Sequence, residues 1–111
     1  MRKQEVNTVI TETAKKYGFE TTVDMFGIAK PECGRDSHIG FKFLPCLSVE
    51  DSNFETGDAV THIEISASIC SMGGSPSPAE LLKAADEIER GARLVAELQS
   101  MNLRYTEHYG K

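Results

Sequence analysis

The sequence predicts an α+β domain of two layers, in which two helices lie on one face of an antiparallel sheet. Two segments, one near each end of the chain, repeat their apolar residues at helical spacing. Three segments between them alternate apolar and polar residues, which is the period of a strand with one wet face. The expected order is therefore α-β-β-β-α. With 111 residues the chain is long enough for one core, so we expect a single domain, residues 1–111.

The first predicted helix covers residues 2–17, and the first predicted strand covers residues 19–28. Apolar residues recur in the helix at three- and four-residue steps: Val6, Val9, Ile10, Ala14 and Tyr17. Gly18 follows them and is typical of a helix C-terminus. The next segment is rich in Phe, Thr and Val, and its alternation places four residues on one side: Phe19, Thr21, Val23 and Met25.

Residues 29–58 are predicted to form a loop, a short strand and a long acidic connection. The loop, residues 29–37, contains three turn-forming residues: Pro31, Gly34 and Asp36. The strand runs from His38 to Leu44, with Ile39, Phe41 and Phe43 on one face, and Pro45 ends it. Residues 47–58 are rich in Ser, Asn, Asp, Glu and Gly, and three apolar residues anchor them: Leu47, Val49 and Phe54.

Residues 59–102 carry the clearest local signals of the chain. Residues 59–70 alternate, with Ile63 on the buried face and His62 on the opposite one. Ser77 is a helix N-cap, followed by Pro78 and by Glu80 three residues after the cap. The second helix runs from Pro78 to about residue 101, and Asn102 can cap its end. A weaker alternation over residues 103–109 allows a further short strand.

The negative charge of the chain is regional. The net charge is −5, yet residues 48–100 hold ten Asp and Glu against three Lys and Arg, a local charge of −7. A general nucleic-acid binder needs clustered Lys and Arg to neutralise phosphates, so this balance argues against direct nucleic-acid binding. Unpaired acids on a loop favour contact with a basic partner.

The N-terminus and the cysteines favour a soluble, cytoplasmic protein. Residues 1–5 lead into a helical pattern and lack the apolar region of a secretory signal. No apolar run approaches the roughly 20 residues that cross a bilayer, so we expect no membrane contact. The three cysteines, Cys33, Cys46 and Cys70, are odd in number and widely spaced, which predicts free thiols.

The cysteines and histidines do not predict a metal site, and we expect no cofactor. Cys33, His38, Cys46, His62 and Cys70 form the candidate set, but none has the spacing of two to four residues with which one turn presents two zinc ligands. A nucleophilic cysteine is a separate candidate. Arg35 lies two residues after Cys33 and can lower the pKa of the Cys33 thiol, and His38 can accept the thiol proton.

The predicted order α-β-β-β-α is similar to that of the double-stranded RNA-binding domain over about residues 3–100. That family places lysines at the start of its second helix to grip phosphates. In this chain the start of the second helix, residues 75–82, holds no basic residue before Lys83, and Glu80, Asp86 and Glu87 lie nearby. The glycine-containing turn before Ser77 is also a poor phosphate site, because Ser77 and Glu80 themselves close the helix terminus. The resemblance therefore implies a fold without its RNA-binding surface.

We expect a non-enzymatic, acidic protein-binding module. The concrete form is a small inhibitor that occupies the basic nucleic-acid channel of a partner enzyme; in size and acidity the chain resembles the anti-restriction and anti-CRISPR proteins of phages and mobile elements. The predicted partner-binding residues are Glu50, Asp51, Glu55, Asp58, Asp86, Glu87 and Glu89. One alternative is a small cysteine-dependent enzyme or ligand-binding domain that uses Cys33 and His38. A second is a homo-oligomeric structural protein, such as a homodimer joined across a two-fold axis through the polar face of the sheet or through the edge of the segment 19–28.

Overall fold

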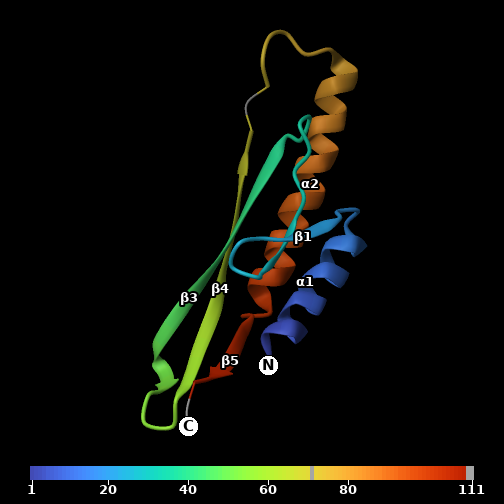
Figure 1. The fold of residues 1–111 in the computed structure, drawn as a ribbon. Coiled ribbons are helices and arrows are strands. Elements are labelled where there is room, and N and C mark those ends of the chain that lie inside the picture. Colours follow the sequence, from blue (N-terminus) through green and yellow to red (C-terminus); the bar gives the residue numbers. More distant parts are fainter. Residues whose placement is uncertain (71, 110–111) are drawn as a thin grey trace.

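The computed structural model describes residues 1–70 and 72–109 and confirms the α+β class (Figure 1). Its elements are α1 (Lys3–Lys16), β1 (Thr21–Val23), β2 (Ala29–Pro31), β3 (Ile39–Asn53), β4 (Asp58–Ile69), α2 (Pro78–Ser100) and β5 (Arg104–His108). Strands β3, β4 and β5 form an antiparallel sheet with β4 in the centre, and β1 and β2 form a separate hairpin. The extra strand before α2 departs from the order of the double-stranded RNA-binding domain.

Both helices pack on the same face of the three-stranded sheet, as expected. Side chains of one face of the sheet enter the core: Ile39, Phe41, Phe43, Ile63, Ile65 and Tyr105. They meet apolar residues of both helices that are fully buried: Val6, Ile10, Leu94 and Leu98. Because burying one such side chain stabilises a fold by about 1.5–3 kcal/mol, this contact between layers is the main source of stability. No helix covers the opposite face of the sheet in the described part of the chain.

The end of α1 confirms the predicted glycine stop. Gly18 has a φ of +82°, and its N–H donates to the Lys15 carbonyl at 3.0 Å. Within α1, the Asn7 side chain clamps the β1–β2 hairpin: its amide donates to the Gly27 carbonyl, and its oxygen accepts from the Ala29 N–H, both at 2.9 Å. The first helix therefore holds the hairpin as well as the sheet.

The predicted strand at residues 19–28 is wrong in extent, because a turn divides it. Asp24 Oδ1 accepts hydrogen bonds from the N–H groups of Phe26 (2.8 Å) and Ile28 (3.1 Å), and Gly27 adopts a φ of +74°. An aspartate that bonds the backbone ahead of it forms a turn. The chain then reverses, and β2 occupies the start of the predicted loop.

The predicted end of β3 at Pro45 is also wrong, because the strand continues to Asn53. Pro45 lies opposite Ile63 in the register of the β3–β4 pair. β3 is an edge strand, and an edge strand tolerates proline because one of its sides has no ladder bonds to lose. Residues 47–53, predicted as part of a loose acidic connection, are therefore strand.

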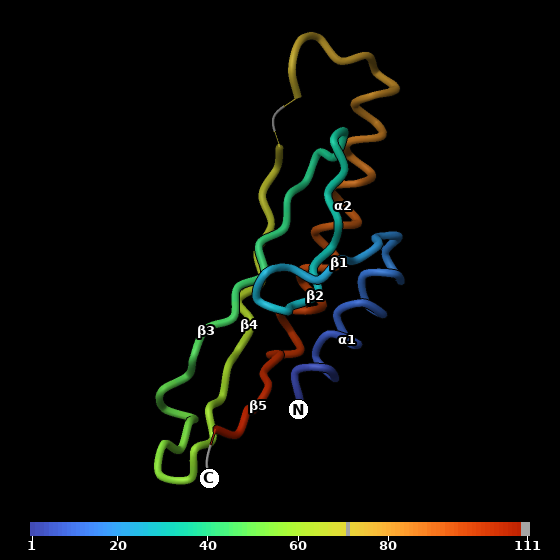
Figure 2. Tube along the Cα trace, in the orientation of Figure 1, coloured from blue at the N-terminus to red at the C-terminus, as the bar shows by residue number. Residues whose placement is uncertain are grey.

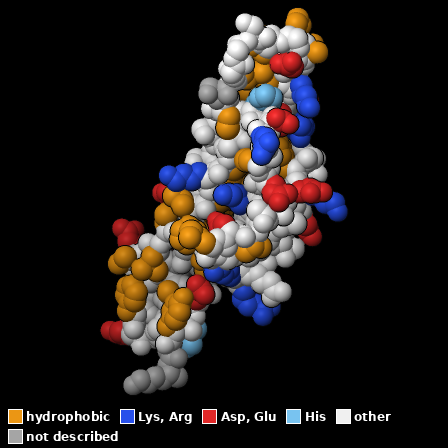
Figure 3. Space-filling view, turned by 45° about the horizontal axis from the view of Figure 1, so that its top comes forward, with side chains coloured by type: hydrophobic (Ala, Val, Ile, Leu, Met, Phe, Trp, Pro, Cys, Tyr) orange, Lys and Arg blue, Asp and Glu red, His pale blue; other side chains and the backbone are white. Residues whose placement is uncertain are grey.

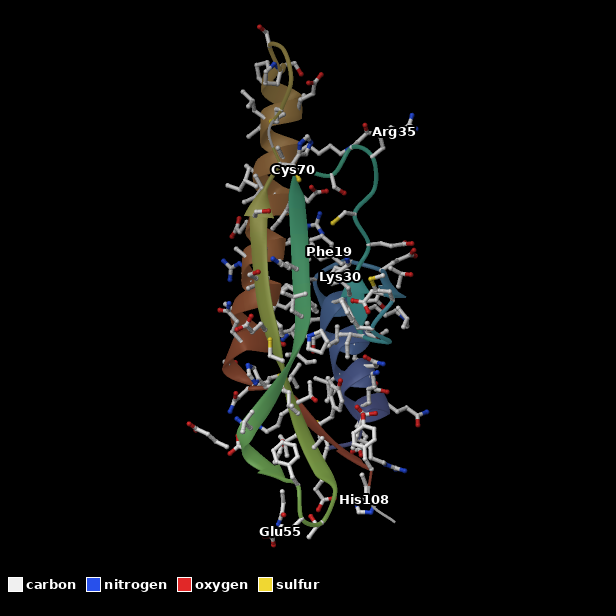
Figure 4. All side chains as sticks on the ribbon, turned by 60° about the vertical axis from the view of Figure 1, so that its left-hand side comes forward. Phe19, Lys30, Arg35, Glu55, Cys70 and His108 are labelled. Carbon is white, nitrogen blue, oxygen red and sulfur yellow. The ribbon has the colours of Figure 1, made fainter. Side chains whose placement is uncertain are left out.

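The second helix begins and ends as predicted. Ser77 Oγ accepts from the Glu80 N–H at 3.2 Å, Pro78 occupies the first turn, and Asn102 takes a φ of +49° just beyond the C-terminus. Arg90 of α2 joins the helix to the end of α1, since its guanidinium donates to the Tyr17 carbonyl at 2.8 Å. The same group lies 5.0 Å from the ring centre of Phe19, which is labelled in Figure 4.

The last strand confirms the weak C-terminal alternation. β5 (Arg104–His108) pairs with residues 58–62 of β4, and its Thr106 N–H donates to the Met1 carbonyl at 2.9 Å. The first and last described residues therefore lie at the same end of the molecule (Figure 1). The fold is elongated, with principal extents of 59 × 24 × 22 Å.

Candidate functional site

The β3–β4 hairpin extends beyond the ends of both helices, and residues 47–60 of this extension are here termed the hairpin arm (Figure 2). The helices no longer cover the sheet there. Leu47, Val49 and Phe54 are 53%, 66% and 63% exposed, although apolar residues of the same strand nearer the helices are buried. Figure 3 shows hydrophobic side chains gathered over this end of the molecule.

Polar side chains of the arm accept hydrogen bonds from backbone N–H groups where the strand pairing is irregular. The β3–β4 register shifts between Ser48 and Asn53, and the Ser52 hydroxyl accepts from the Val60 N–H at 2.9 Å across this bulge. In the turn, Asn53 Oδ1 accepts from the N–H groups of Glu55 (3.1 Å) and Thr56 (3.3 Å). The Ser- and Asn-rich composition that suggested a loose connection therefore forms a bulge and a tight turn.

Two of the four predicted binding acids in the arm have partners from β5, so the expectation that all four are unpaired is wrong. Asp51 pairs with Arg104 at 3.0 Å. Asp58 lies 2.8 Å from His108 Nδ1, and hydrogen bonds from His108 and then Thr56 lower the pKa of the Asp58 carboxyl. The cause is topological, because β5 returns beside β4 and brings basic residues that are distant in sequence.

Glu50 and Glu55 have no ion-pair partner within residues 1–70 and 72–109, and both are exposed. Glu55 lies at the tip of the arm, and His108 lies at the same end of the molecule (Figure 4). In sequence, Glu50 directly follows Val49, and Glu55 directly follows Phe54. The arm thus offers an apolar surface with free negative charge beside it.

The three predicted binding acids of α2 lie apart from the arm. They belong to the N-terminal half of the helix, which points toward the opposite end of the molecule (Figure 1). Asp86 pairs with Arg90 and Glu89 with Arg93, each at 2.9 Å and each across the four-residue step that places side chains together on a helix. Glu87 accepts a hydrogen bond from the His38 backbone N–H. The seven acids therefore form two separate groups, and most of them are already paired.

The Cys33 region shows no nucleophile–base pair among the described residues. The Cys33 thiol contacts the Ile39 carbonyl at 3.3 Å, and the hydrogen bonds of His38 are made by its backbone, to Glu87 and to the Cys70 N–H. All three cysteines are free, as predicted. No hydrogen bond joins the Cys33 thiol to the His38 ring in this part of the structure, so nothing in the geometry favours the cysteine-dependent alternative.

The sheet brings together three metal-ligating side chains that sequence spacing did not connect. Cys46 of β3 lies directly opposite His62 of β4, and Glu64 is two residues further along the same face of β4. The ligand atoms of the three side chains all lie within 4.8 Å of one another. Burial, followed by the charge of Glu64, raises the pKa of the Cys46 thiol. The signal that could have found this trio is the strand register, because only cross-strand pairing joins residues 46 and 62.

Comparison with known proteins identifies no relative of this chain. No family model matches it, no curated protein matches it, and no solved structure has a matching fold at a significant level. Among the described residues, neither helix is long and apolar enough to span a membrane. The functional argument therefore depends on the geometry of the arm and the sheet.

Proposed function

We propose that the chain is a non-enzymatic protein-binding module that docks on a basic partner surface through its hairpin arm. The observation that carries the proposal is the exposure of Leu47, Val49 and Phe54 on one projecting hairpin. Single exposed apolar residues are normal on a protein surface, but a contiguous group is typical of an interaction site. A hairpin that projects beyond its helices can also enter a cleft that a flat surface cannot enter.

The free charge of the arm supports a basic partner. Glu50 and Glu55 carry negative charge without a cation in the described structure, and they lie next to the apolar residues in sequence. Complementary charge steers association, while buried apolar side chains supply most of the affinity. The concrete form of the proposal is an inhibitor whose arm enters the basic nucleic-acid channel of an enzyme, as expected for a protein of the anti-restriction or anti-CRISPR kind.

Within this proposal the seven acidic residues have different roles. Glu50 and Glu55 act directly at the interface, and Asp51 and Asp58 mainly hold the arm against β5 through Arg104 and His108. Asp86, Glu87 and Glu89 remain candidate contacts for a partner large enough to reach along α2.

The test begins with affinity capture from the organism that encodes the chain, at low and high salt, and continues with the purified partner. Two arm variants are compared with the wild type: Val49→Ser with Phe54→Ser, and Glu50→Gln with Glu55→Gln. Leu82→Ser is the matched control, because Leu82 is 72% exposed on α2, away from the arm. We expect the apolar variant to weaken binding at least tenfold, which corresponds to about 1.4 kcal/mol.

The charge variant should slow association and flatten its salt dependence, because steering depends on unscreened charge. Excess nucleic acid should displace the chain from the partner. Equal affinity of the wild type and both arm variants would contradict the proposal. Capture of a second copy of this chain alone, with a doubled mass in solution, would favour the homo-oligomeric alternative instead.

A further inference from the structure

We propose that Cys46, His62 and Glu64 form a binding site for a zinc ion on the face of the sheet that the helices leave open. The inference does not depend on the partner-binding function of the arm. Its basis is the convergence of a thiol, an imidazole and a carboxylate, whose ligand atoms lie within 4.8 Å of one another. These are the three ligand types that proteins use for zinc.

The positions of the three residues in the sheet explain why they converge. Cys46 and His62 are direct partners in the antiparallel register, and side chains in such pairs have Cβ atoms about 4.5–5.5 Å apart. Glu64 follows His62 by two residues and so projects from the same face of β4. The backbone of two paired strands holds all three residues, which makes the site less dependent on loop motion.

The distances fit a zinc ion after small side-chain rotations. Zinc bonds to sulfur, nitrogen and oxygen are about 2.0–2.3 Å long, so tetrahedral ligands lie about 3.5 Å apart. The observed separation of up to 4.8 Å exceeds this by roughly one ångström. Glu64 is exposed, so its side chain has room to rotate toward the other two ligands.

The surroundings leave the ligands available. His108 is held by Asp58, whereas the ring nitrogens of His62 have no hydrogen-bond partner within the described residues. Arg104 lies opposite His62 on β5, and its guanidinium is engaged by Asp51 at 3.0 Å. The positive charge of Arg104 is therefore partly neutralised by Asp51.

The ligand chemistry selects zinc over magnesium or calcium. Both of those ions prefer oxygen ligands, whereas a thiolate and an imidazole suit a borderline ion such as Zn²⁺. Three protein ligands leave a fourth position, which a water molecule or a side chain from another molecule can occupy. A zinc ion bound by Cys46, His62 and Glu64 would join β3 to β4 near the base of the arm and so stiffen the arm.

The test is a zinc titration of the reduced, tag-free protein against a chromophoric chelator, with native mass spectrometry for stoichiometry. We expect one zinc ion per chain, and a loss of affinity of at least tenfold in Cys46→Ser, His62→Gln and Glu64→Gln. Cobalt substitution should give a thiolate-to-cobalt absorption band in the near ultraviolet that Cys46→Ser abolishes. Magnesium should not compete.

Two other thiols serve as matched controls. Cys33 and Cys70 are exposed and free, and Cys70 lies toward the opposite end of the sheet from the arm (Figure 4). Cys33→Ser and Cys70→Ser should therefore bind zinc like the wild type. Circular dichroism of each variant separates loss of ligation from loss of folding, and Glu64→Gln is almost isosteric. Unchanged zinc affinity in Cys46→Ser, or dependence on Cys33 or Cys70, would overturn the assignment.

Discussion

Gly91 of α2 offers a sharp test of the packing between helix and sheet. A methyl group added at Gly91 would clash with Ile39 Cδ1 and would lie 3.3 Å from Phe41 Cζ. Alanine is a better helix former than glycine by about 1 kcal/mol, whereas inserting a methyl group into a packed core costs about 1–3 kcal/mol. Gly91→Ala should therefore destabilise the fold by up to about 2 kcal/mol.

A second substitution separates the two opposing effects. Ile39→Val removes the Cδ1 atom that the new methyl group would meet, at its own cost of about 0.5–1.5 kcal/mol. In that background the clash is relieved and the helix gain remains, so Gly91→Ala should become neutral or stabilising by up to about 1 kcal/mol. The coupling between the two sites is thus about 1–3 kcal/mol.

The measurement is urea unfolding of the wild type, both single variants and the double variant, followed by circular dichroism of the helices. Similar slopes of free energy against urea concentration would show that the four proteins unfold in a comparable way. Gly73→Ala is the matched control, because a Cβ atom there meets nothing within 4 Å. An equal effect of Gly91→Ala in both backgrounds would refute the close approach of α2 to β3.

Three further changes probe the helices, with Leu82→Ala, an exposed α2 position, as a control expected to stay within about 0.5 kcal/mol of the wild type in urea unfolding. Asn7→Ala should cost about 1–3 kcal/mol in the same assay, because it leaves two backbone groups of the hairpin without their partner; a cost equal to that of the control would contradict the clamp. Leu98→Ala should cost about 2–5 kcal/mol, since Leu98 is fully buried, and a smaller loss would place it outside the core. The hydrogen bond from Lys16 lowers the pKa of the Glu97 carboxyl in the folded protein. The ionised carboxyl therefore stabilises the fold fully above the ordinary pKa of 4.5, and this stabilisation is lost as the pH falls through the lowered pKa of the folded state. The difference in melting temperature between wild type and Glu97→Gln should therefore shrink below pH 4.5, and a constant difference down to pH 3 would argue against the pair.

The parts of the fold that the sequence predicts well are those that depend on neighbouring residues. Ser77 and Pro78 define the start of α2, and Gly18 and Asn102 define helix ends, because capping involves groups a few residues apart. The spacing of apolar residues in α1, α2 and β4 can likewise be recognised within each segment alone. The possible strand at residues 103–109 was also visible, since alternation needs no knowledge of the partner strand.

The errors arise where a distant partner decides the outcome. Pro45 ends a strand on local grounds, yet the edge position of β3 lets the strand continue. Asp51 has no basic neighbour in sequence, but Arg104 reaches it from β5. Cys46 and His62 are 16 residues apart and meet only through the register. Composition therefore located the acidic region, but it could not show which acids are paired or which ligands converge.

The distribution of pairing changes what the acidic charge can do. Seven free acids on one surface would resemble a strand of nucleic acid, and binding would weaken steeply with salt. In the structure Asp51, Asp58, Asp86 and Glu89 are paired, and the acids of the arm and of α2 lie apart. A partner that the arm contacts meets two free carboxylates beside three exposed apolar side chains. Association through the arm should therefore depend on apolar burial for its affinity and on charge mainly for its rate, so the salt dependence of the affinity should be shallow and should arise in the association rate.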